Sequence, residues 1–380
     1  MSRRPVAVDS PLIRPALAEL VPYEPGKPVE EVQRELGLDR VVRLCSNEGP
    51  FEPFPAAREA IARLTRDLNR YPDGGAYRLR QALAERHGVR MQEVTVCAGA
   101  DAVIGYVSLV TLDPGDEAVT GWPSFPSYVL DPLKVGGVPV RVPLRDDRFD
   151  LDALLEAITS RTKLVFVGAP NNPTGTTNTR DELDSYFARV PAHVLTVVDQ
   201  AYLEYVDDPD YPDAIEEYAK AGHRVLVLRT FSKIFGLAGL RVGYGIGPED
   251  VIAAIGKVRR AFDVTSAGQE AALASLGDEQ ELARRREANR EAMMLLERTL
   301  REHGYDPVGP AVANFLFVRV GDARSVDDAL LRRGVIVRHM GSFGAPDALR
   351  ITAGTAEEVA FLAEALDAVA SPDAPAAAPA

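Results

Sequence analysis

Short apolar runs alternate with helical segments through the middle of the chain, and this alternation restricts the folds that are open to it. The apolar runs are rich in Val and Leu and lie at 93–99, 117–121, 139–144, 163–170, 194–202 and 224–232. Segments with helical periodicity, among them 101–112, 151–158 and 180–190, lie between several of them. Near-continuous apolar strands separated by helices favour a mostly parallel sheet covered on both faces. The sequence therefore predicts an α/β fold.

The last third of the chain has a different pattern, which predicts a second domain. A long polar helical segment at 279–304 is followed by strand-like runs at 314–320, 334–340 and 348–354 and a helical segment at 357–370. The 380 residues exceed the size of about 250–300 at which a single core usually stops growing. We expect an N-terminal arm that also joins the small domain (1–44), a large domain (45–275), a small α+β domain (276–371) and a low-complexity tail (372–380).

Charge and composition exclude several classes of partner. The formal net charge of −13 argues against nucleic acid or an anionic membrane surface as a partner. No run approaches the roughly 18 apolar residues of a membrane span, and the first residues do not read as a leader segment. Cys45 and Cys97 are too few for a disulfide framework, and no metal site is predicted. These features predict a cytoplasmic protein.

Polar residues follow the predicted strands at the positions where open α/β sheets bind ligands, beyond the carboxyl ends. Ala100 and Asp101 begin a helix after the run 93–99, and the free N–H groups of a helix start suit a phosphate. Asp101 taken alone is more simply a helix cap. Asn172 follows the run 163–170 and offers an amide N–H to an acceptor such as a phenolic oxygen.

Two further strand ends carry charge. Asp199 directly follows apolar residues, where a carboxylate needs a partner, and Tyr202 lies three residues later. The segment TFSKIFGLAGLR (230–241) then places Lys233 after a strand. A desolvated lysine, or one near other cations, has a lowered pKa and attacks carbonyl groups. Thr230, Ser232 and Arg241 of the same segment could hold a phosphate while the amine stays reactive.

A single cofactor would use all of these groups. Pyridoxal 5′-phosphate (PLP) has an aldehyde, a pyridine nitrogen, a phenolic oxygen and a phosphate, and it requires a lysine and an anion beside the ring nitrogen. Each motif is weak or moderate evidence alone. Their combination, in this order and each at a strand end, predicts a PLP site.

TFSKIFGLAGLRVGY (230–244) resembles the lysine signature of the class II branch of the fold-type I PLP-dependent aminotransferases. PNNPTG (170–175) and DQAY (199–202) match two further markers of that family, and the resemblance runs from about residue 20 to 370. It implies a large domain with a mostly parallel seven-stranded sheet, a smaller α+β domain, and a homodimer with shared active sites.

The resemblance also implies a role for each matching residue. Lys233 would bond the cofactor and carry the proton during the reaction, and Asp199 would pair with the pyridine nitrogen. The other implied cofactor contacts are Tyr202 and Asn172 at the phenolic oxygen, Phe125 against the ring, and Ala100, Asp101, Thr230, Ser232, Arg241 and Tyr71 of the partner subunit at the phosphate.

Further segments are similar to those of the histidinol-phosphate aminotransferase subfamily. They are PYEPGKP (22–28), SNE (46–48), RYPDGG (70–75), GAD (99–101), PSFPSY (123–128), VIVRHM (335–340) and LRITAGT (349–355). This similarity implies that histidinol phosphate and 2-oxoglutarate are interconverted with imidazole acetol phosphate and glutamate, a reaction of histidine biosynthesis. Arg350 would bind the donor carboxylate, and Tyr23, Asn47 and Arg338 would complete the substrate pocket.

Two phenylalanines depart from the subfamily pattern and leave alternatives open. Phe125 and Phe262 stand where tyrosines are expected, which predicts a more apolar pocket. An aromatic amino-acid aminotransferase acting on phenylalanine or tyrosine is therefore the alternative reading. A PLP-dependent decarboxylase of the threonine-phosphate type is a more distant one. A non-enzymatic sensor is disfavoured by the intact Lys233.

Overall fold

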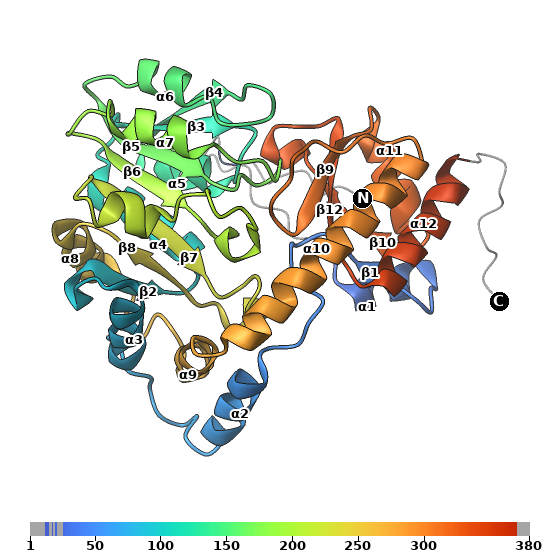
Figure 1. Cartoon of the computed structure of the whole chain (residues 1–380), viewed down its shortest axis with the longest axis horizontal. Coiled ribbons are helices and arrows are strands. Elements are labelled where there is room, and N and C mark those ends of the chain that lie inside the picture. The colour runs from blue at the N-terminus through green and yellow to red at the C-terminus, as the bar shows by residue number, and fades with distance from the viewer. Residues whose placement is uncertain (1–11, 15–16, 18–19, 21–25, 371–380) are drawn as a thin grey trace.

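A sheet of seven strands forms the larger part of the molecule, and a smaller group of strands and helices lies beside it (Figure 1). The structure is a computed structural model that describes residues 12–14, 17, 20 and 26–370. Tyr23 and the predicted tail (372–380) lie outside the described residues. In the part of the chain that is described, no helix is long and apolar enough to cross a membrane.

The large sheet has the strand order β2-β8-β7-β6-β5-β3-β4. The strands are Val94–Cys97 (β2), Glu117–Trp122 (β3), Val138–Pro143 (β4), Thr162–Gly168 (β5), Leu195–Asp199 (β6), Val225–Thr230 (β7) and Gly243–Ile246 (β8). Neighbouring strands are parallel except that β8 runs antiparallel to both β2 and β7. The predicted α/β fold with a mostly parallel seven-stranded sheet is confirmed.

Helices cover both faces of this sheet because successive strand residues point to opposite sides. Leu226 and Leu228 of β7 pack in one core with the helices α4 (Ala100–Thr111), α5 (Ser127–Val135) and α8 (Glu249–Val258). Val225 and Val227 belong to the core on the other face. The helices of that second face are α2 (Pro55–Leu64), α3 (Tyr77–His87), α6 (Leu151–Glu156), α7 (Arg180–Phe187) and α9 (Ser266–Ser275).

The carboxyl ends of the parallel strands meet at one edge of the sheet. Strand β2 shares this direction, because it and β7 both run antiparallel to β8. The residues after β2, β3, β5, β6 and β7 are therefore brought to the same edge, and β8 begins there. This arrangement gathers segments that lie far apart in the sequence.

The smaller part of the molecule contains two short sheets. Strands β9 (Phe315–Arg319), β12 (Ala348–Thr352) and β11 (Arg338–His339) form an antiparallel sheet, and β1 (Val42–Arg43) pairs with β10 (Val335–Ile336). The prediction of a single strand at 334–340 is wrong, because β10 and β11 belong to different sheets and Val337 lies between them. The surrounding helices are α1 (Val29–Leu36), α10 (Glu279–Glu302), α11 (Ala323–Leu331) and α12 (Ala356–Ala370).

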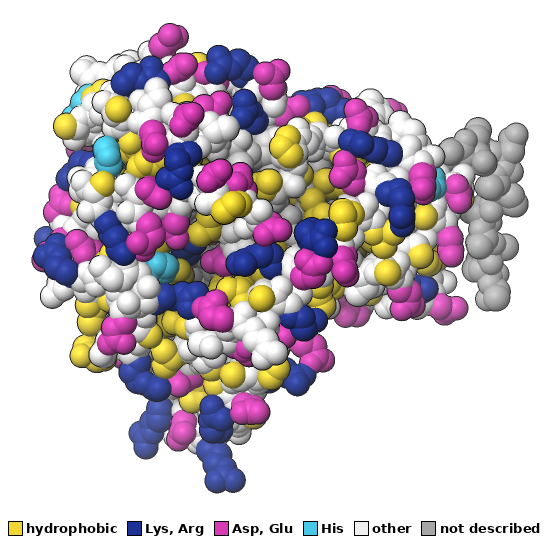
Figure 2. Space-filling model, viewed as in Figure 1, with side chains coloured by type: hydrophobic (Ala, Val, Ile, Leu, Met, Phe, Trp, Pro, Cys, Tyr) yellow, Lys and Arg dark blue, Asp and Glu magenta, His cyan; other side chains and the backbone are white. Residues whose placement is uncertain are grey.

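Both ends of the described chain contribute to this smaller part. Val42 and Leu44 lie in one apolar core with residues of β9, β12 and α12. Val32 of α1 packs with Cys45 and Ile336. On the face shown in Figure 2, positive and negative side chains are interspersed over the surface, and no patch of one sign dominates it.

Candidate active site

A cavity of about 170 Å³ opens at the carboxyl edge of the sheet. The predicted site residues that line it are Asn47, Ala100, Asp101, Phe125, Asn172, Asp199, Tyr202, Thr230, Ser232, Lys233, Arg241 and Arg350. Ser46, Tyr128, Pro170, Ala201 and Phe343 complete its wall. Residues that were selected from separate sequence motifs therefore surround one space.

Lys233 reaches this cavity from the turn after β7. Its Nζ atom donates to the Ser46 carbonyl at 3.3 Å and lies 5.4 Å from the centroid of the Tyr202 ring. Burial lowers the pKa of Lys233 to about 7, and the positive charges of Arg350 and Arg241 act in the same direction. Near neutral pH a large share of the molecules therefore has an uncharged amine, the form that attacks carbonyl carbons.

Asp199 ends β6 and presents a buried carboxylate. Its Oδ2 atom accepts a hydrogen bond from the Tyr128 hydroxyl at 2.8 Å, and Oδ1 accepts one from the Ala201 N–H at 3.0 Å. Burial raises the pKa of Asp199, while these two hydrogen bonds and the charge of Lys233 oppose that rise. A carboxylate held in this way can keep a cationic ring nitrogen protonated.

An anion-binding corner lies at the start of α4. Gly99 precedes the helix with φ +87°, and a Cβ at that position would lie 2.8 Å from the Arg241 Nη2 atom. The guanidinium therefore packs directly against the turn that leads to Ala100. Nearby, the Thr230 hydroxyl accepts a hydrogen bond from the Ser232 N–H at 3.1 Å. A helix start with an arginine and two hydroxyls beside it suits a phosphate group.

The Asp101 side chain is turned to α5. Its Oδ1 atom accepts a short hydrogen bond from the Ser127 hydroxyl. Phe125 lies just before α5, and its ring meets Tyr128 edge-on at 5.7 Å. Asp101 can therefore contribute its backbone N–H, and Phe125 an aromatic surface, to a ligand in the cavity.

Amide and hydroxyl groups occupy the opposite side of the cavity. The Asn47 Nδ2 atom donates to the Tyr202 hydroxyl at 2.9 Å. The Asn172 Oδ1 atom accepts a hydrogen bond from Arg350 Nη1, so that its Nδ2 group remains as a donor. These polar groups suit an acceptor oxygen on an aromatic ring.

The two predicted substrate arginines occupy facing positions of the small sheet, where Arg338 pairs in register with Arg350. Both are buried, and their guanidinium carbons lie 5.8 Å and 5.5 Å from the centroid of the Phe343 ring. Arg350 also donates to the Cys45 carbonyl at 2.7 Å. Arg350 lines the cavity, whereas Arg338 is not among the lining residues.

Two of the aromatic residues singled out in the sequence lie on the surface. Tyr71 is 81% exposed and stacks on Phe262, which is 44% exposed, with ring centroids 4.5 Å apart. Neither residue lines the cavity of its own chain. Of the two phenylalanines expected to make the pocket apolar, Phe125 borders the cavity of its own chain, and the contribution of Phe262 stays a prediction.

The donor set of the cavity fits PLP. It contains an amine with a lowered pKa (Lys233), a carboxylate held by two donors (Asp199), and a helix start beside Arg241 with a glycine where a Cβ would clash. Within the described ranges, no group of three or more His, Cys, Asp or Glu side chains could hold a metal ion.

Tyr128, the buried donor to Asp199, was not predicted as a site residue from the sequence. The available signal was its position three residues after Phe125 in PSFPSY, which is the spacing of one helical turn. Pro132 falls inside this helix and hides the pattern, because proline normally argues against a helix interior.

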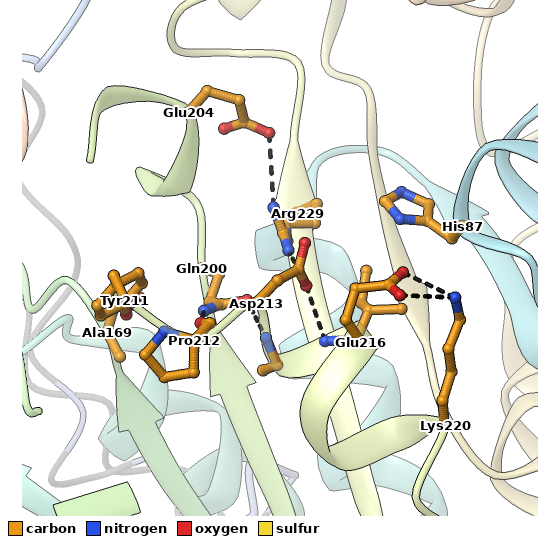
Figure 3. A network of polar contacts seen from close by, with 12 residues as sticks. His87, Ala169, Gln200, Glu204, Tyr211, Pro212, Asp213, Glu216, Lys220 and Arg229 are labelled. Carbon is orange, nitrogen blue, oxygen red and sulfur yellow. Dashed lines mark hydrogen bonds and ion pairs between the residues drawn. The ribbon is translucent and has the colours of Figure 1, made fainter. Parts of the chain in front are cut away.

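A network of ion pairs surrounds the buried side chain of Arg229 on β7 (Figure 3). Arg229 precedes Thr230, so its side chain points away from the cavity, and it pairs with Asp213 at 2.6 Å and with Glu204 at 3.7 Å. His87 lies beside the network, and burial followed by the charge of Arg229 lowers its pKa to about 4. The network connects β7 to the segment after Tyr202 without entering the cavity.

Comparisons with known proteins identify the family of the chain. A sequence model described as "Aminotransferase class I and II" matches residues 39–366. A histidinol-phosphate aminotransferase from Akkermansia muciniphila is 45% identical over 92% of this chain and 96% of the relative. One from Moorella thermoacetica is 43% identical over 91% of this chain and 89% of the relative.

Solved structures give the same result. The crystal structure of histidinol-phosphate aminotransferase from Sinorhizobium meliloti in complex with pyridoxal-5′-phosphate superposes with a TM-score of 0.86 at 28% identity, covering 97% of this chain and all (100%) of that one. A Thermus thermophilus aspartate aminotransferase (a double mutant) reaches a TM-score of 0.81 at 26% identity, with 94% and 99% coverage. The predicted family resemblance is confirmed.

Proposed function

The chain belongs to the class I and II aminotransferase family, and from this premise we propose that it is the PLP-dependent transaminase that interconverts histidinol phosphate and 2-oxoglutarate with imidazole acetol phosphate and glutamate. The single observation that carries the chemistry is the Lys233 amine, whose pKa is lowered to about 7 in a cavity that also contains Asp199 and Arg350. The substrate is supported by the names of relatives that are 45% and 43% identical over nearly the whole chain.

The cavity residues hold the cofactor in distinct ways. The N–H groups of Ala100 and Asp101 at the start of α4, together with Thr230, Ser232 and Arg241, would bind the phosphate. Asp199 would face the ring nitrogen, Asn172 and Tyr202 the ring oxygen, and Phe125 the ring face. When it is bound, PLP supplies an aldehyde that reacts with amines and a ring that withdraws electrons.

Lys233 is the residue that moves the proton. Its pKa of about 7 lets Nζ accept a proton and release it again without a large energetic cost in either direction. The Ser46 carbonyl, which accepts a hydrogen bond from Nζ at 3.3 Å, keeps the amine at the cavity wall. Phe343 and Arg350 of the smaller part of the molecule line the same cavity as Lys233.

One pocket must accept both glutamate and a phosphate-bearing amino alcohol. Arg350, which already binds the Asn172 side chain and the Cys45 carbonyl, is placed to take the donor carboxylate. A guanidinium group binds carboxylate and phosphate alike, so Arg338 on the neighbouring strand can serve the second anion when the small domain closes. Asn47 and Tyr23 would complete the pocket.

The proposed assembly is a homodimer in the cytoplasm, with Tyr71 of the partner subunit completing each phosphate site. The exposed Tyr71–Phe262 stack supports this proposal, because stacked rings at the surface are a favourable contact for a second copy. We propose the same domain division as before, with residues 45–275 as the large domain and 1–44 with 276–371 as the small one. Sedimentation of Phe262→Asp, which should shift towards monomer, tests the dimer.

The function is tested by mixing purified PLP-loaded protein with histidinol phosphate and 2-oxoglutarate and measuring the glutamate that forms. Phenylalanine in place of histidinol phosphate is the competing donor, and carbon dioxide release is measured in the same samples. Turnover with histidinol phosphate that far exceeds turnover with phenylalanine supports the proposal. Equal or faster turnover with phenylalanine would indicate an aromatic aminotransferase, and carbon dioxide release a decarboxylase.

Lys233→Ala is the control for this assay. It should abolish glutamate formation with every donor, because Lys233 is the one lysine among the described residues that line the cavity. Activity near wild type in this variant would mean that the reaction takes place elsewhere.

A further inference from the structure

We propose that Tyr128 is a positioning residue that holds the Asp199 carboxylate ionised and aimed at the ring nitrogen of bound PLP. This inference deepens the proposed function and rests on it. Tyr128 does not contact a substrate, and its effect passes through Asp199.

Among the described residues, the Tyr128 hydroxyl has one hydrogen-bond partner, the Asp199 carboxylate. The side chain is 2% exposed, and its hydroxyl donates to Asp199 Oδ2 at 2.8 Å. The ring stacks on Phe166 at 5.1 Å with an interplanar angle of 6°, and Phe125 meets it edge-on at 77°. These contacts fix the ring plane, so the hydroxyl stays on the line to the carboxylate.

A glycine on the neighbouring strand creates the room for this contact. Gly168 of β5 pairs in register with Asp199 of β6. A Cβ at Gly168 would lie only 3.3 Å from the Tyr128 hydroxyl oxygen. Any side chain at this position would press on the hydroxyl, and the glycine lets the phenol cross over β5 to reach the carboxylate.

In the hydrogen bond between Tyr128 and Asp199, the phenol is the donor and the carboxylate is the acceptor. Burial and the negative charge of Asp199 raise the pKa of Tyr128 well above its usual value, so the phenol stays protonated and donates. Burial also raises the pKa of Asp199, and the hydrogen bond from Tyr128 is the largest influence against that rise. The carboxylate would otherwise be left with the Ala201 N–H as its hydrogen-bond donor among the described residues. Removing the hydroxyl should therefore raise the pKa of Asp199 further and reduce the share of ionised carboxylate that faces the ring nitrogen.

Tyr128 also connects two cofactor contacts. Phe125, which would lie against the ring face, is three residues before Tyr128, and the two rings touch. The same short segment therefore orients the ring face through Phe125 and the ring nitrogen through Tyr128 and Asp199.

The test compares the binding of two cofactors to the cofactor-free protein by equilibrium dialysis. One is PLP, and the other is its analogue with a carbon atom in place of the ring nitrogen. Tyr128→Phe keeps the ring stack and removes only the hydroxyl. A hydrogen bond to a buried charge is worth a factor of about 10–100 in an equilibrium constant, so the variant should bind PLP at least about tenfold more weakly than wild type. The carbon analogue should bind wild type and variant within about twofold, because it lacks the nitrogen through which Asp199 acts.

Tyr186→Phe is the matched control. Tyr186 is another fully buried tyrosine, and its hydroxyl lies 3.0 Å from the Thr196 hydroxyl on the same strand as Asp199. It lies outside the cavity, so its variant should bind both compounds as wild type does. If Tyr128→Phe does not fold, Gly168→Ala is the second comparison. Its methyl group would lie 3.3 Å from the Tyr128 hydroxyl oxygen and push it by a few tenths of an ångström, so PLP binding should weaken selectively but less than in Tyr128→Phe.

The binding of the two compounds to the Tyr128→Phe variant distinguishes a positioning role of Tyr128 from a packing role. A loss confined to PLP supports the role of Tyr128. An equal loss for both compounds would show a packing role, and no loss for either would show that Asp199 does not depend on Tyr128; both results overturn the inference while leaving the proposed function intact. Failure of the wild-type protein to bind PLP would overturn the proposed function itself.

Discussion

The most direct prediction concerns the protonation of Lys233 in the cofactor-free protein. Burial and the charges of Arg350 and Arg241 lower its pKa from 10.5 to about 7. At pH 7 about half of the Lys233 side chains should then be neutral, compared with about 0.03% for a lysine whose pKa is 10.5. The difference in the reactive fraction exceeds a factor of about 1,000.

A small amine-directed reagent measures this fraction, with the modified peptides quantified by mass spectrometry between pH 5 and 10. The sign follows from the titration: below pH 7 the ammonium form dominates and labelling slows, and above pH 7 labelling reaches a plateau. Exposed Lys257 of α8, modified in the same sample, is the internal comparison. Arg241→Gln should move the Lys233 midpoint upwards, because it removes a positive charge that disfavours the ammonium form.

The pH midpoint decides whether the reasoning holds. If labelling of Lys233 rises in parallel with that of Lys257 up to pH 10, burial and the two arginines do not depress the pKa. The same shift has a consequence for folding. Between about pH 7 and 10.5 the unfolded chain holds more protons on Lys233 than the folded chain does, so the stability of the cofactor-free protein should rise with pH over this range.

Three further substitutions test other parts of the structure. Arg229→Met leaves the partly buried carboxylates of Glu204 and Asp213 without their cation and should lower the free energy of unfolding by about 1.5–3 kcal/mol in urea titrations. Arg224→Met, at an exposed ion pair, should cost about 0–1 kcal/mol. Gly99→Ala places a methyl group against the Arg241 guanidinium at a position with positive φ, so the protein should retain less PLP in dialysis. Unchanged retention would mean that Arg241 does not bind the phosphate. Arg350→Ala should raise the KM for glutamate by about 10–100-fold, and a normal KM in steady-state assays would mean that another residue binds the donor carboxylate.

The parts of the site that follow strand ends were predictable from the sequence. Lys233, Asp199 and Asn172 each come directly or shortly after a buried apolar run, and parallel strands bring such positions to one edge. Their meeting in one cavity therefore follows from local patterns and one topological rule.

Other features depend on contacts that no local pattern encodes. Strand β8 (Gly243–Ile246) was missed because two of its four residues are glycines, which are poor strand formers, yet it is fully buried between β7 and β2. Tyr128 was missed because its role arises from a contact with a residue 71 positions away. Arg338 was correctly placed on a strand, but whether it borders the cavity depends on how the small domain sits against the large one.

The pairing of β1 with β10 has a consequence for the synthesis of the chain. Val42 and Leu44 leave the ribosome early, but the residues that cover them, including Val335 and Ile351, are translated only after the whole large domain. Until then these side chains are exposed on the nascent chain, and contacts between distant residues form slowly because a long loop must close first. A chain that stops before residue 335 therefore leaves an apolar segment uncovered beside a large domain that has its own core. Ribosome-bound fragments of this length should bind chaperones through residues 42–44, and release should coincide with the emergence of β10 and β12.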